Sequence, residues 1–271
     1  GAETTPFFHD YVTEGSASLR NFEVGARYVA TLKGRTVDET IEFETEGLAP
    51  RCISLSGRSN TRDMGGRVMM NGRRVRQGLM YRTGQFEEAG VMRISEETRK
   101  YIVETLGIRM DIDLRQDSAV ASIVANGGVS PLGPTVRWIH EWDNYHDYSN
   151  VHTTGADATK RIFRYMMDPA NYPMVFHCAG GADRTGTLAT LVHGVLGASD
   201  DEIWMDYYIT AWGGAINQKR YPVWISSLIH SFDKFEGATI SDRICAYFRE
   251  TLGFTDEDLD KIRDIMLEPL S

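Results

Sequence analysis

Cys178 and Arg184 stand six positions apart in a segment that could attack and hold a phosphate ester. The segment reads Met174-Val-Phe-His-Cys-Ala-Gly-Gly-Ala-Asp-Arg-Thr-Gly186. Its first three residues are apolar and predict a short buried strand, and the residues from Leu188 to Leu196 have the apolar spacing of a helix. The cysteine is therefore expected at the end of a strand and the arginine at the start of a helix.

The glycines between them could shape the connection into an anion site. Gly180 and Gly181 permit backbone angles that other residues avoid, so successive N–H groups can turn inward as a nest. The helix that follows adds unpaired N–H groups and the positive end of its dipole. The residues expected to bind phosphate are Ala179, Gly180, Gly181, Ala182, Thr185 and Gly186.

The same positive environment would activate Cys178. A free cysteine has a pKa of about 8.5, and a helix N-terminus with nearby cations can lower it to roughly 3.5–7.5. The thiolate could then attack phosphorus and form a phosphocysteine. Arg184 offers a planar fork for two phosphate oxygens, and the Thr185 hydroxyl could donate to Cys178. We expect His177 to brace the loop through its ring nitrogens rather than to transfer a proton.

Hydrolysis also needs a carboxyl group that protonates the leaving oxygen and later activates water. Asp183 lies inside the loop, and Asp143 lies thirty-five positions before Cys178, just after a predicted strand at 136–139. We favour Asp183 and retain Asp143 as the alternative acid. Asp113, in Ile-Asp-Leu-Arg, is expected to be a scaffold residue at the end of a strand.

A metal centre is not predicted. His146, Asp147 and His152 are the candidate ligands, but their spacing matches no standard site. The chemistry expected at Cys178 needs no cofactor.

The pattern His-Cys-x-x-Gly-x-Asp-Arg-Thr-Gly resembles the phosphate-binding loop of the cysteine-dependent protein tyrosine phosphatases, above all the atypical bacterial type with Asp before Arg. The resemblance covers most of residues 50–271, including the segments Ser59-Asn-Thr-Arg-Asp-Met-Gly-Gly66, Gly72-Arg-Arg-Val-Arg-Gln-Gly-Leu-Met-Tyr-Arg-Thr83, Ile112-Asp-Leu-Arg115 and Leu252-Gly-Phe-Thr-Asp-Glu-Asp-Leu259. It implies a phosphotyrosine phosphatase with a phosphocysteine intermediate, with dual specificity left open. It also implies that Asp183 acts as the acid.

One position departs from that family. Ala182 stands where the family usually carries lysine, and the missing cation counts against strongly anionic substrates. An inositol phosphate or phosphoinositide phosphatase is therefore the second hypothesis. A phosphate-binding pseudo-phosphatase and a rhodanese-like sulfur transferase are further alternatives, disfavoured by the intact Cys178, Asp183 and Arg184 and by the Asp-Arg-Thr-Gly continuation.

From residue 49 to 271, strand and helix patterns alternate, which predicts an α/β domain with a partly parallel central sheet flanked by helices. Ser95, Ser199 and Thr255 are expected helix N-caps. Residues 1–48 are predicted to form a small β-rich segment, because Thr40-Ile-Glu-Phe-Glu-Thr-Glu46 alternates after a first strand and a Gly34-Arg35 turn. That segment resembles part of a fibronectin type III domain; a β-hairpin extension of the catalytic domain is the alternative.

Composition narrows the partners. Of the 271 residues, 42% are hydrophobic and 25% are charged, which is ordinary for a globular protein. The net charge of -9 argues against nucleic-acid binding, which favours basic surfaces. We expect a phosphorylated protein or small phosphoester as substrate and no membrane-spanning segment, since no apolar run reaches about 20 residues. Oligomeric state is not predictable. A fibronectin-like segment would favour a secreted, periplasmic or cell-surface location, with a cytoplasmic one as the alternative.

Three other features have weaker implications. Cys52 and Cys245 are expected as two buried thiols, with a bridge between them as the alternative. The aromatic segment from Trp142 to His152 is a candidate substrate lid. The basic run Arg73-Arg74-Val-Arg76 is interpreted as a solvated turn that could attract an anion.

Overall fold

A five-stranded sheet carries the strand that ends at Cys178. The computed structural model describes residues 16, 19–47, 49–57, 60–142, 152, 155–212 and 221–269. In spatial order the strands are β3 (Arg62–Asp63), β5 (Met80–Gly84), β10 (Met174–Cys178), β8 (Met110–Asp113) and β9 (Arg137–His140). Only β3 runs antiparallel to its neighbour. The predicted α/β class with a partly parallel sheet is confirmed.

The central strand β10 is buried along its whole length, as its apolar sequence predicts. It pairs in parallel with β5, where Cys178 is opposite Gly84, and with β8, where His177 is opposite Asp113. Because parallel strands end at one edge of a sheet, these residues meet at the carboxyl edge, where ligands bind in open α/β sheets.

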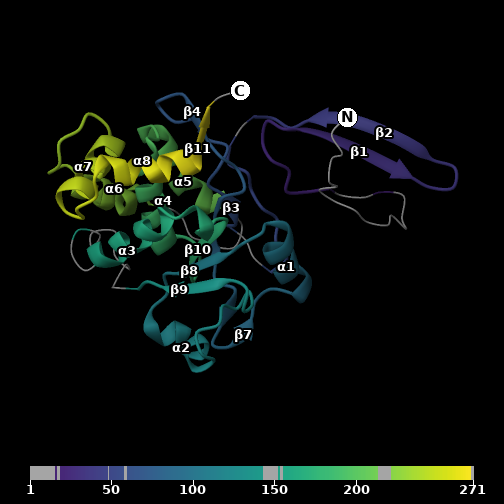
Figure 1. Cartoon of the computed structure of the whole chain (residues 1–271), viewed down its shortest axis with the longest axis horizontal. Coiled ribbons are helices and arrows are strands. Elements are labelled where there is room, and N and C mark those ends of the chain that lie inside the picture. The colour runs from purple at the N-terminus through teal and green to yellow at the C-terminus, as the bar shows by residue number, and fades with distance from the viewer. Residues whose placement is uncertain are drawn as a thin grey trace.

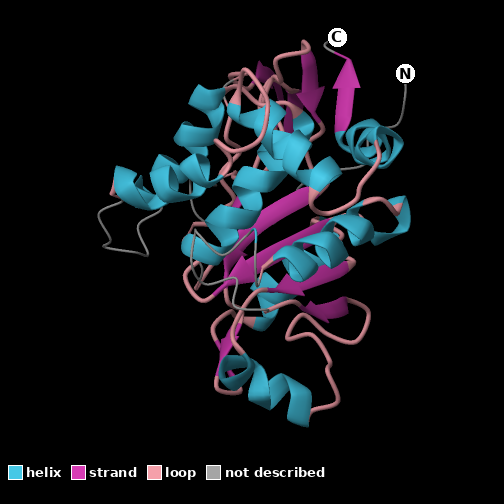
Figure 2. Cartoon of the chain, turned by 90° about the vertical axis from the view of Figure 1, so that its left-hand side faces the viewer, coloured by secondary structure: helices cyan, strands magenta, loops and turns pink. Residues whose placement is uncertain are grey.

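Helices cover both faces of this sheet, which Figure 2 shows with its strands side by side. They are α1 (Glu96–Lys100), a π-helical segment (Tyr101–Thr105), α2 (Asp117–Ala125), α3 (Ala156–Met166), a 3₁₀ turn (Pro169–Asn171), α4 (Asp183–Leu196), α5 (Asp200–Trp212), α6 (Pro222–Ser231), α7 (Ile240–Glu250) and α8 (Asp256–Met266). In β10, Met174 and Phe176 join the core formed with α3–α8, whereas Val175 joins a second core with Tyr81 and Ile102. Successive side chains of β10 thus point to opposite faces of the sheet and pack into two different cores.

The expected helix starts are present. The Ser95 side chain accepts from the Thr98 N–H at the start of α1, and Thr255 forms a full capping box with Asp258. At α5, the Glu202 N–H donates to Ser199 Oγ at 3.3 Å. The predicted caps therefore fix where these helices begin.

The predicted N-terminal strands form a two-stranded hairpin, β1 (Arg27–Lys33) and β2 (Asp38–Glu44), which projects away from the rest of the chain in Figure 1. Its base is packed by the rings of Phe22, Tyr28 and Phe43. Further out, Ile41 is 64% exposed, so the alternating pattern builds strands without burying their apolar face. The boundary at residue 48 stays a prediction.

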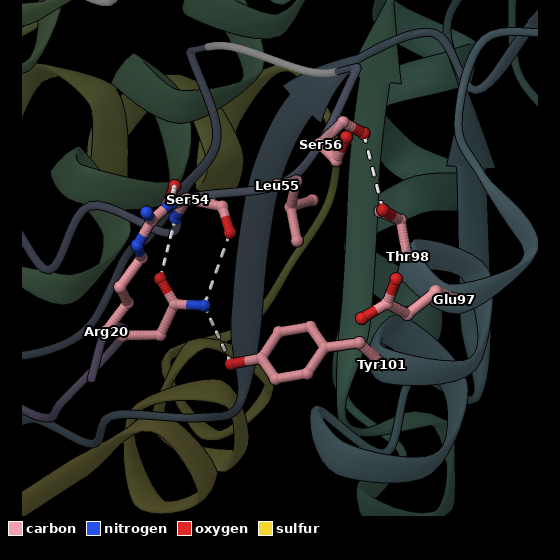
Figure 3. Close-up of a pocket in the computed structure, with 8 residues that line it drawn as sticks. Arg20, Ser54, Leu55, Ser56, Glu97, Thr98 and Tyr101 are labelled. Atoms are coloured by element: carbon pink, nitrogen blue, oxygen red, sulfur yellow. Dashed lines mark hydrogen bonds between the residues drawn. The ribbon is translucent and has the colours of Figure 1, made fainter. Parts of the chain in front are cut away.

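The segment before the hairpin is held to the body through Asn21. Its Oδ1 accepts from the Ser54 N–H at 2.7 Å, and its Nδ2 donates to the Tyr101 hydroxyl at 2.9 Å. Figure 3 shows these bonds at the wall of a pocket of about 450 Å³, between Arg20 and Ser54 on one side and Thr98 and Tyr101 on the other. Buried Arg51 also donates to the Asn21 carbonyl at 2.8 Å. The pocket's polar groups therefore serve largely to attach the N-terminal segment.

Two sequence interpretations were wrong. The first concerns Cys52, which is exposed because Arg51, Ile53 and Leu55 take the buried side of this extended segment and leave Cys52 on the other. Cys245 is buried as predicted, and both thiols are free.

The second concerns the basic run at 73–76, which is not a solvated turn. Residues Arg73–Val75 form β4, which pairs with β11 (Leu267–Pro269) near the C-terminus. Arg74 Nη2 lies 2.9 Å from Glu268, and Arg76 Nε donates to the Leu267 carbonyl at 3.2 Å. These arginines fasten two chain segments that are far apart in the sequence.

Candidate active site

The connection from β10 to α4, which we call the Cys178–Arg184 loop, brings the predicted site residues together at the sheet edge. Cys178 ends β10, Ala182 is the N-cap of α4, and Asp183 is the first residue of the helix. Gly181 has φ +66°, and a Cβ there would lie 2.5 Å from the Thr83 carbonyl oxygen on β5. Glycine is thus required at this position both by conformation and by close approach of the neighbouring strand.

Three successive carbonyls of the loop are bound from outside. Ala179 O accepts from the Gln85 N–H at 3.1 Å, and Asn60 Nδ2 donates to Gly180 O at 3.3 Å and to Gly181 O at 2.8 Å. In a trans peptide the C=O and the following N–H point in opposite directions. The N–H groups of residues 180–182 therefore face away from these donors, as an anion nest requires.

Cys178 is 3% exposed. Its thiol lies close to the backbone N–H groups of this loop and to Arg184. Burial alone would raise the pKa of its thiol, but the Arg184 guanidinium, the Thr185 hydroxyl and N–H, and the Ala182 N–H together lower the pKa below its usual value. Each of these groups stabilises the thiolate. The fold thus shifts the Cys178 thiol toward its thiolate form.

Arg184 is half-buried and held on two sides. Its Nη1 donates to the Leu114 carbonyl at 3.1 Å, and its Cζ lies 5.5 Å from the centroid of the Trp142 ring. The side chain is thereby held in place without a ligand, which would reduce the entropy cost of binding an anion.

His177 is fully buried behind the loop. Its Nε2 lies 3.0 Å from Asp111 Oδ1 and 3.8 Å from Asp113 Oδ2. Burial opposes protonation of the ring, but the Asp113 and Asp111 carboxylates outweigh it and raise the His177 pKa. An imidazole held between carboxylates is suited to bracing the loop, the role expected from the sequence.

Asp113 lies at the end of β8 in a buried ion pair. Arg115 donates from Nε to Oδ1 at 2.9 Å and from Nη2 to Oδ2 at 2.6 Å. Burial would raise the pKa of Asp113, whereas His177 and Arg115 lower it overall. The carboxylate is thus committed to neighbouring cations, in keeping with a scaffold role.

Of the two candidate acids, the structure describes one. Asp183 is half-buried at the first position of α4, five residues after Cys178. Asp143 lies outside the described residues, but the residue before it, Trp142, contacts Arg184. Most of the predicted lid, with His146 and Asp147, lies outside the described residues as well.

Four polar residues were not identified as part of the site from the sequence. Asn60 and Arg82 donate hydrogen bonds to the Gly181 carbonyl. Behind them, Arg62 donates to Asn60, and Asp206 forms an ion pair with Arg82. Three of them fall within segments that carry the family resemblance. Asp206 lies in α5 with no surrounding motif, so only the folded chain identifies it.

The described residues contain no cluster of three or more His, Cys, Asp or Glu side chains suited to a metal. His152, one of the candidate ligands, bonds Ser231 Oγ at 2.6 Å and packs edge-on against Phe232 and Tyr247. Burial lowers its pKa to about 4. This histidine is half-buried and packed among aromatic side chains. Within the same described ranges, every helix is too short or too polar to cross a bilayer.

Comparisons with known proteins agree with this geometry. The model of the "Tyrosine phosphatase family" matches residues 53–268. A protein of Cupriavidus necator with the provisional name tyrosine-protein phosphatase is 30% identical over 185 residues, covering 59% of this chain and 66% of its own length, just under two thirds.

Two solved structures of the SIW14 catalytic core, one described as a PP-IP phosphatase from S. cerevisiae, share 14% identity and a TM-score of 0.39. They cover 70% and 79% of this chain and 91% and 93% of their own. A likeness this distant carries no argument about this chain. The family model, by contrast, spans most of the chain and includes the whole Cys178–Arg184 loop. The chain belongs to the tyrosine phosphatase family.

Proposed function

We propose that this chain hydrolyses phosphomonoesters with Cys178 as nucleophile and Arg184 as phosphate clamp. The observation that carries the proposal is the lowered pKa of a buried thiol at the mouth of an anion nest, beside an arginine. Thiolate, inward N–H groups and guanidinium are the parts needed to bind a phosphate dianion and to stabilise its transition state.

The reaction proceeds in two steps. In the first, the Cys178 thiolate forms an S–P bond while the ester P–O bond breaks, and the leaving oxygen takes a proton from a carboxyl group. In the second, water attacks phosphorus, its proton passes to that carboxylate, and the S–P bond breaks to release inorganic phosphate and the thiolate. Thr185, which stabilises the thiolate, assists its departure.

We assign the proton transfer to Asp183, with Asp143 as the alternative. Asp183 is part of the Cys178–Arg184 loop and so stays with the nucleophile whatever the neighbouring segments do. The contact of Trp142 with Arg184 supports the alternative, because it brings the chain just before Asp143 to the site. Substrates whose leaving groups differ in basicity separate the two carboxyl groups.

The proposed substrate is phosphotyrosine in a protein. Membership of the tyrosine phosphatase family supports this assignment. The charge of the loop supports it as well, because buried Ala182 adds no cation that would favour several phosphates on one ligand. Every described residue of the site lies between Asn60 and Asp206, which supports a catalytic domain at 49–271 with residues 1–48 appended.

A small aryl phosphate tests the chemistry. Hydrolysis should persist in excess chelator, be lost in Cys178→Ser, and leave a trapped phosphocysteine on rapid acid quenching of the wild type. Undiminished hydrolysis by Cys178→Ser would rule out the mechanism.

A substrate panel tests the assignment. Phosphotyrosine peptides should be turned over with higher kcat/KM than phosphoserine or phosphothreonine peptides and than inositol phosphates. A comparable kcat/KM on the serine and threonine peptides would replace tyrosine specificity with dual specificity, and a preference for inositol phosphates would replace the proposed substrate class.

A further inference from the structure

The carbonyl oxygen of Gly181 is held by two side chains from outside the Cys178–Arg184 loop. Arg82 Nη2 donates to it at 2.9 Å and Asn60 Nδ2 donates to it at 2.8 Å. Both donors are buried, Arg82 completely so. Two buried donors on one carbonyl fix the orientation of the peptide plane between Gly181 and Ala182.

The N–H end of that peptide group lies next to Cys178, the proposed nucleophile. Because C=O and N–H point oppositely in a trans peptide, holding Gly181 O outward turns the Ala182 N–H inward. The Ala182 N–H is one of the donors that stabilise the Cys178 thiolate. The position of the Arg82 side chain is therefore linked to the environment of the sulfur through one rigid peptide group.

Arg82 is itself anchored by Asp206 of α5, which packs beside α4 (Figure 1). Arg82 Nη1 forms an ion pair with Asp206 Oδ2, while Arg62 Nε and Arg67 Nη2 lie 3.0 Å and 3.5 Å from Asp206 Oδ1. All four side chains are buried. Burial favours the neutral acid, but the arginines, Arg62 first, keep the pKa of Asp206 well below its usual range. Removing this carboxylate would leave three buried cations with one fewer counter-ion.

We propose that Arg82 and Asp206 are positioning residues for the nucleophile: Asp206 fixes the Arg82 guanidinium, and Arg82 turns the Gly181–Ala182 peptide so that its N–H faces the sulfur of Cys178. The inference deepens the proposed function and rests on it for its catalytic meaning. Neither side chain is accessible to a ligand, because Arg82 is 0% and Asp206 3% exposed. Both act through the backbone of the Cys178–Arg184 loop.

The test measures the pH dependence of Cys178 alkylation by iodoacetamide, which reports the thiolate and needs no turnover. Exposed Cys52 is first replaced by Ser, and modification of Cys178 is followed by mass spectrometry of its peptide. Because the assay does not depend on hydrolysis, it decides the positioning role even if Cys178→Ser shows the proposed function to be wrong.

Arg82→Met should raise the pH midpoint of alkylation by about one unit, so that the rate at a pH well below both midpoints falls about tenfold, and kcat should fall with it. Arg82→Lys keeps the charge but replaces the rigid fork with a single ammonium group. At least half of the shift should remain in Arg82→Lys. A wild-type midpoint in Arg82→Lys would show that charge alone matters and would overturn the proposal.

Asp206→Asn distinguishes positioning from simple electrostatics by the sign of the change. The substitution leaves the arginines and removes a negative charge, so Coulomb interaction alone would lower the midpoint. Loss of the anchor for Arg82 should instead raise it. A lowered midpoint in a folded Asp206→Asn protein contradicts the proposal, and if this variant does not fold, Arg82→Lys decides the question.

Arg51→Met is the matched control. Arg51 is also a buried arginine that binds a carboxylate, Asp63 at 3.1 Å, and a backbone carbonyl, Asn21 O at 2.8 Å, but its contacts lie outside the Cys178–Arg184 loop. Its removal should leave the alkylation midpoint unchanged although stability falls. An equal shift in Arg51→Met would mean that any lost buried cation perturbs Cys178, and the specific role of Arg82 would be excluded.

Discussion

The ring of Trp142 lies against the guanidinium of Arg184, with 5.5 Å between the Arg184 Cζ and the ring centroid. Trp142 follows β9 and Arg184 is the second residue of α4, so two segments that are forty-two positions apart meet at the proposed phosphate clamp. A contact of this kind is worth about 0.5–1 kcal/mol at partly exposed sites. It holds the fork of Arg184 on one side while the Leu114 carbonyl holds it on the other.

Replacing this ring should weaken substrate binding. In Trp142→Ala, Arg184 loses its packing surface and must be ordered by the ligand, so KM for a small aryl phosphate should rise about two- to fivefold. Trp142→Phe keeps an aromatic face and should lie closer to the wild type. Steady-state kinetics on the three proteins measures the effect, and an unchanged KM in Trp142→Ala would show that the contact does not order Arg184.

Gly181→Ala should abolish hydrolysis. The new Cβ would lie 2.5 Å from the Thr83 carbonyl oxygen and 2.9 Å from the Gly84 nitrogen, so the loop would have to leave β5. The residue would also have to keep φ +66°, which costs about 1–2 kcal/mol outside glycine.

Gly197→Ala is the control for that substitution. Gly197 is the C-cap of α4 with φ +86°, but a Cβ at this position would meet no other atom within 4 Å. The variant should lose a similar amount of stability from conformation alone while hydrolysing substrate at the wild-type rate. Thermal unfolding and kcat measured on both variants separate strain from close approach; an active Gly181→Ala would contradict the loop geometry.

The raised pKa of buried His177 predicts a definite pH dependence of stability. In the unfolded chain this histidine titrates near pH 6.5, and in the folded chain the Asp113 and Asp111 carboxylates raise its pKa despite burial. The folded state therefore binds the proton more tightly, and the resulting stability is fully present below about pH 6.5. It is lost as pH rises through the folded pKa.

Urea unfolding of wild type and His177→Gln between pH 5 and 9 measures that contribution. The difference in free energy of unfolding should be largest at the acidic end and should decrease as pH rises. The lost packing and neutral hydrogen bonds add a constant offset, so the pH-dependent part is the diagnostic one. A difference that grows with pH would mean that His177 is neutral in the folded protein.

The sequence was sufficient for the parts of the site that are local in the chain. An apolar strand, a glycine turn and a helical repeat run consecutively through the Cys178–Arg184 loop, so the placement of Cys178 at a strand end and Asp183 at a helix start follows from short-range rules. The caps at Ser95 and Thr255 are equally local, because cap and partner are three residues apart.

What could not be predicted depends on tertiary contacts. Asp206 gathers arginines from positions 62, 67 and 82, more than a hundred residues away, and no spacing rule connects them. Cys52 shows the same limit on a smaller scale: its extended segment alternates, but only the packing of Ile53 and Leu55 decides which face is buried. The run at 73–76 has the polar composition of a turn, but its first three residues form a strand because β11, near the C-terminus, pairs with them.

The general acid is distinguished by how its loss depends on the leaving group. We expect Asp183→Asn to slow hydrolysis of phenyl phosphate, whose leaving oxygen needs a proton, far more than that of p-nitrophenyl phosphate, which departs as a stable anion. General acid catalysis contributes about 10²–10⁴-fold, so the difference between the two substrates should reach at least tenfold. Asp143→Asn should reduce both rates by a similar, small factor. The reverse pattern, with the leaving-group dependence in Asp143→Asn, would transfer the role to the segment that follows Trp142 and would leave Asp183 as a loop residue.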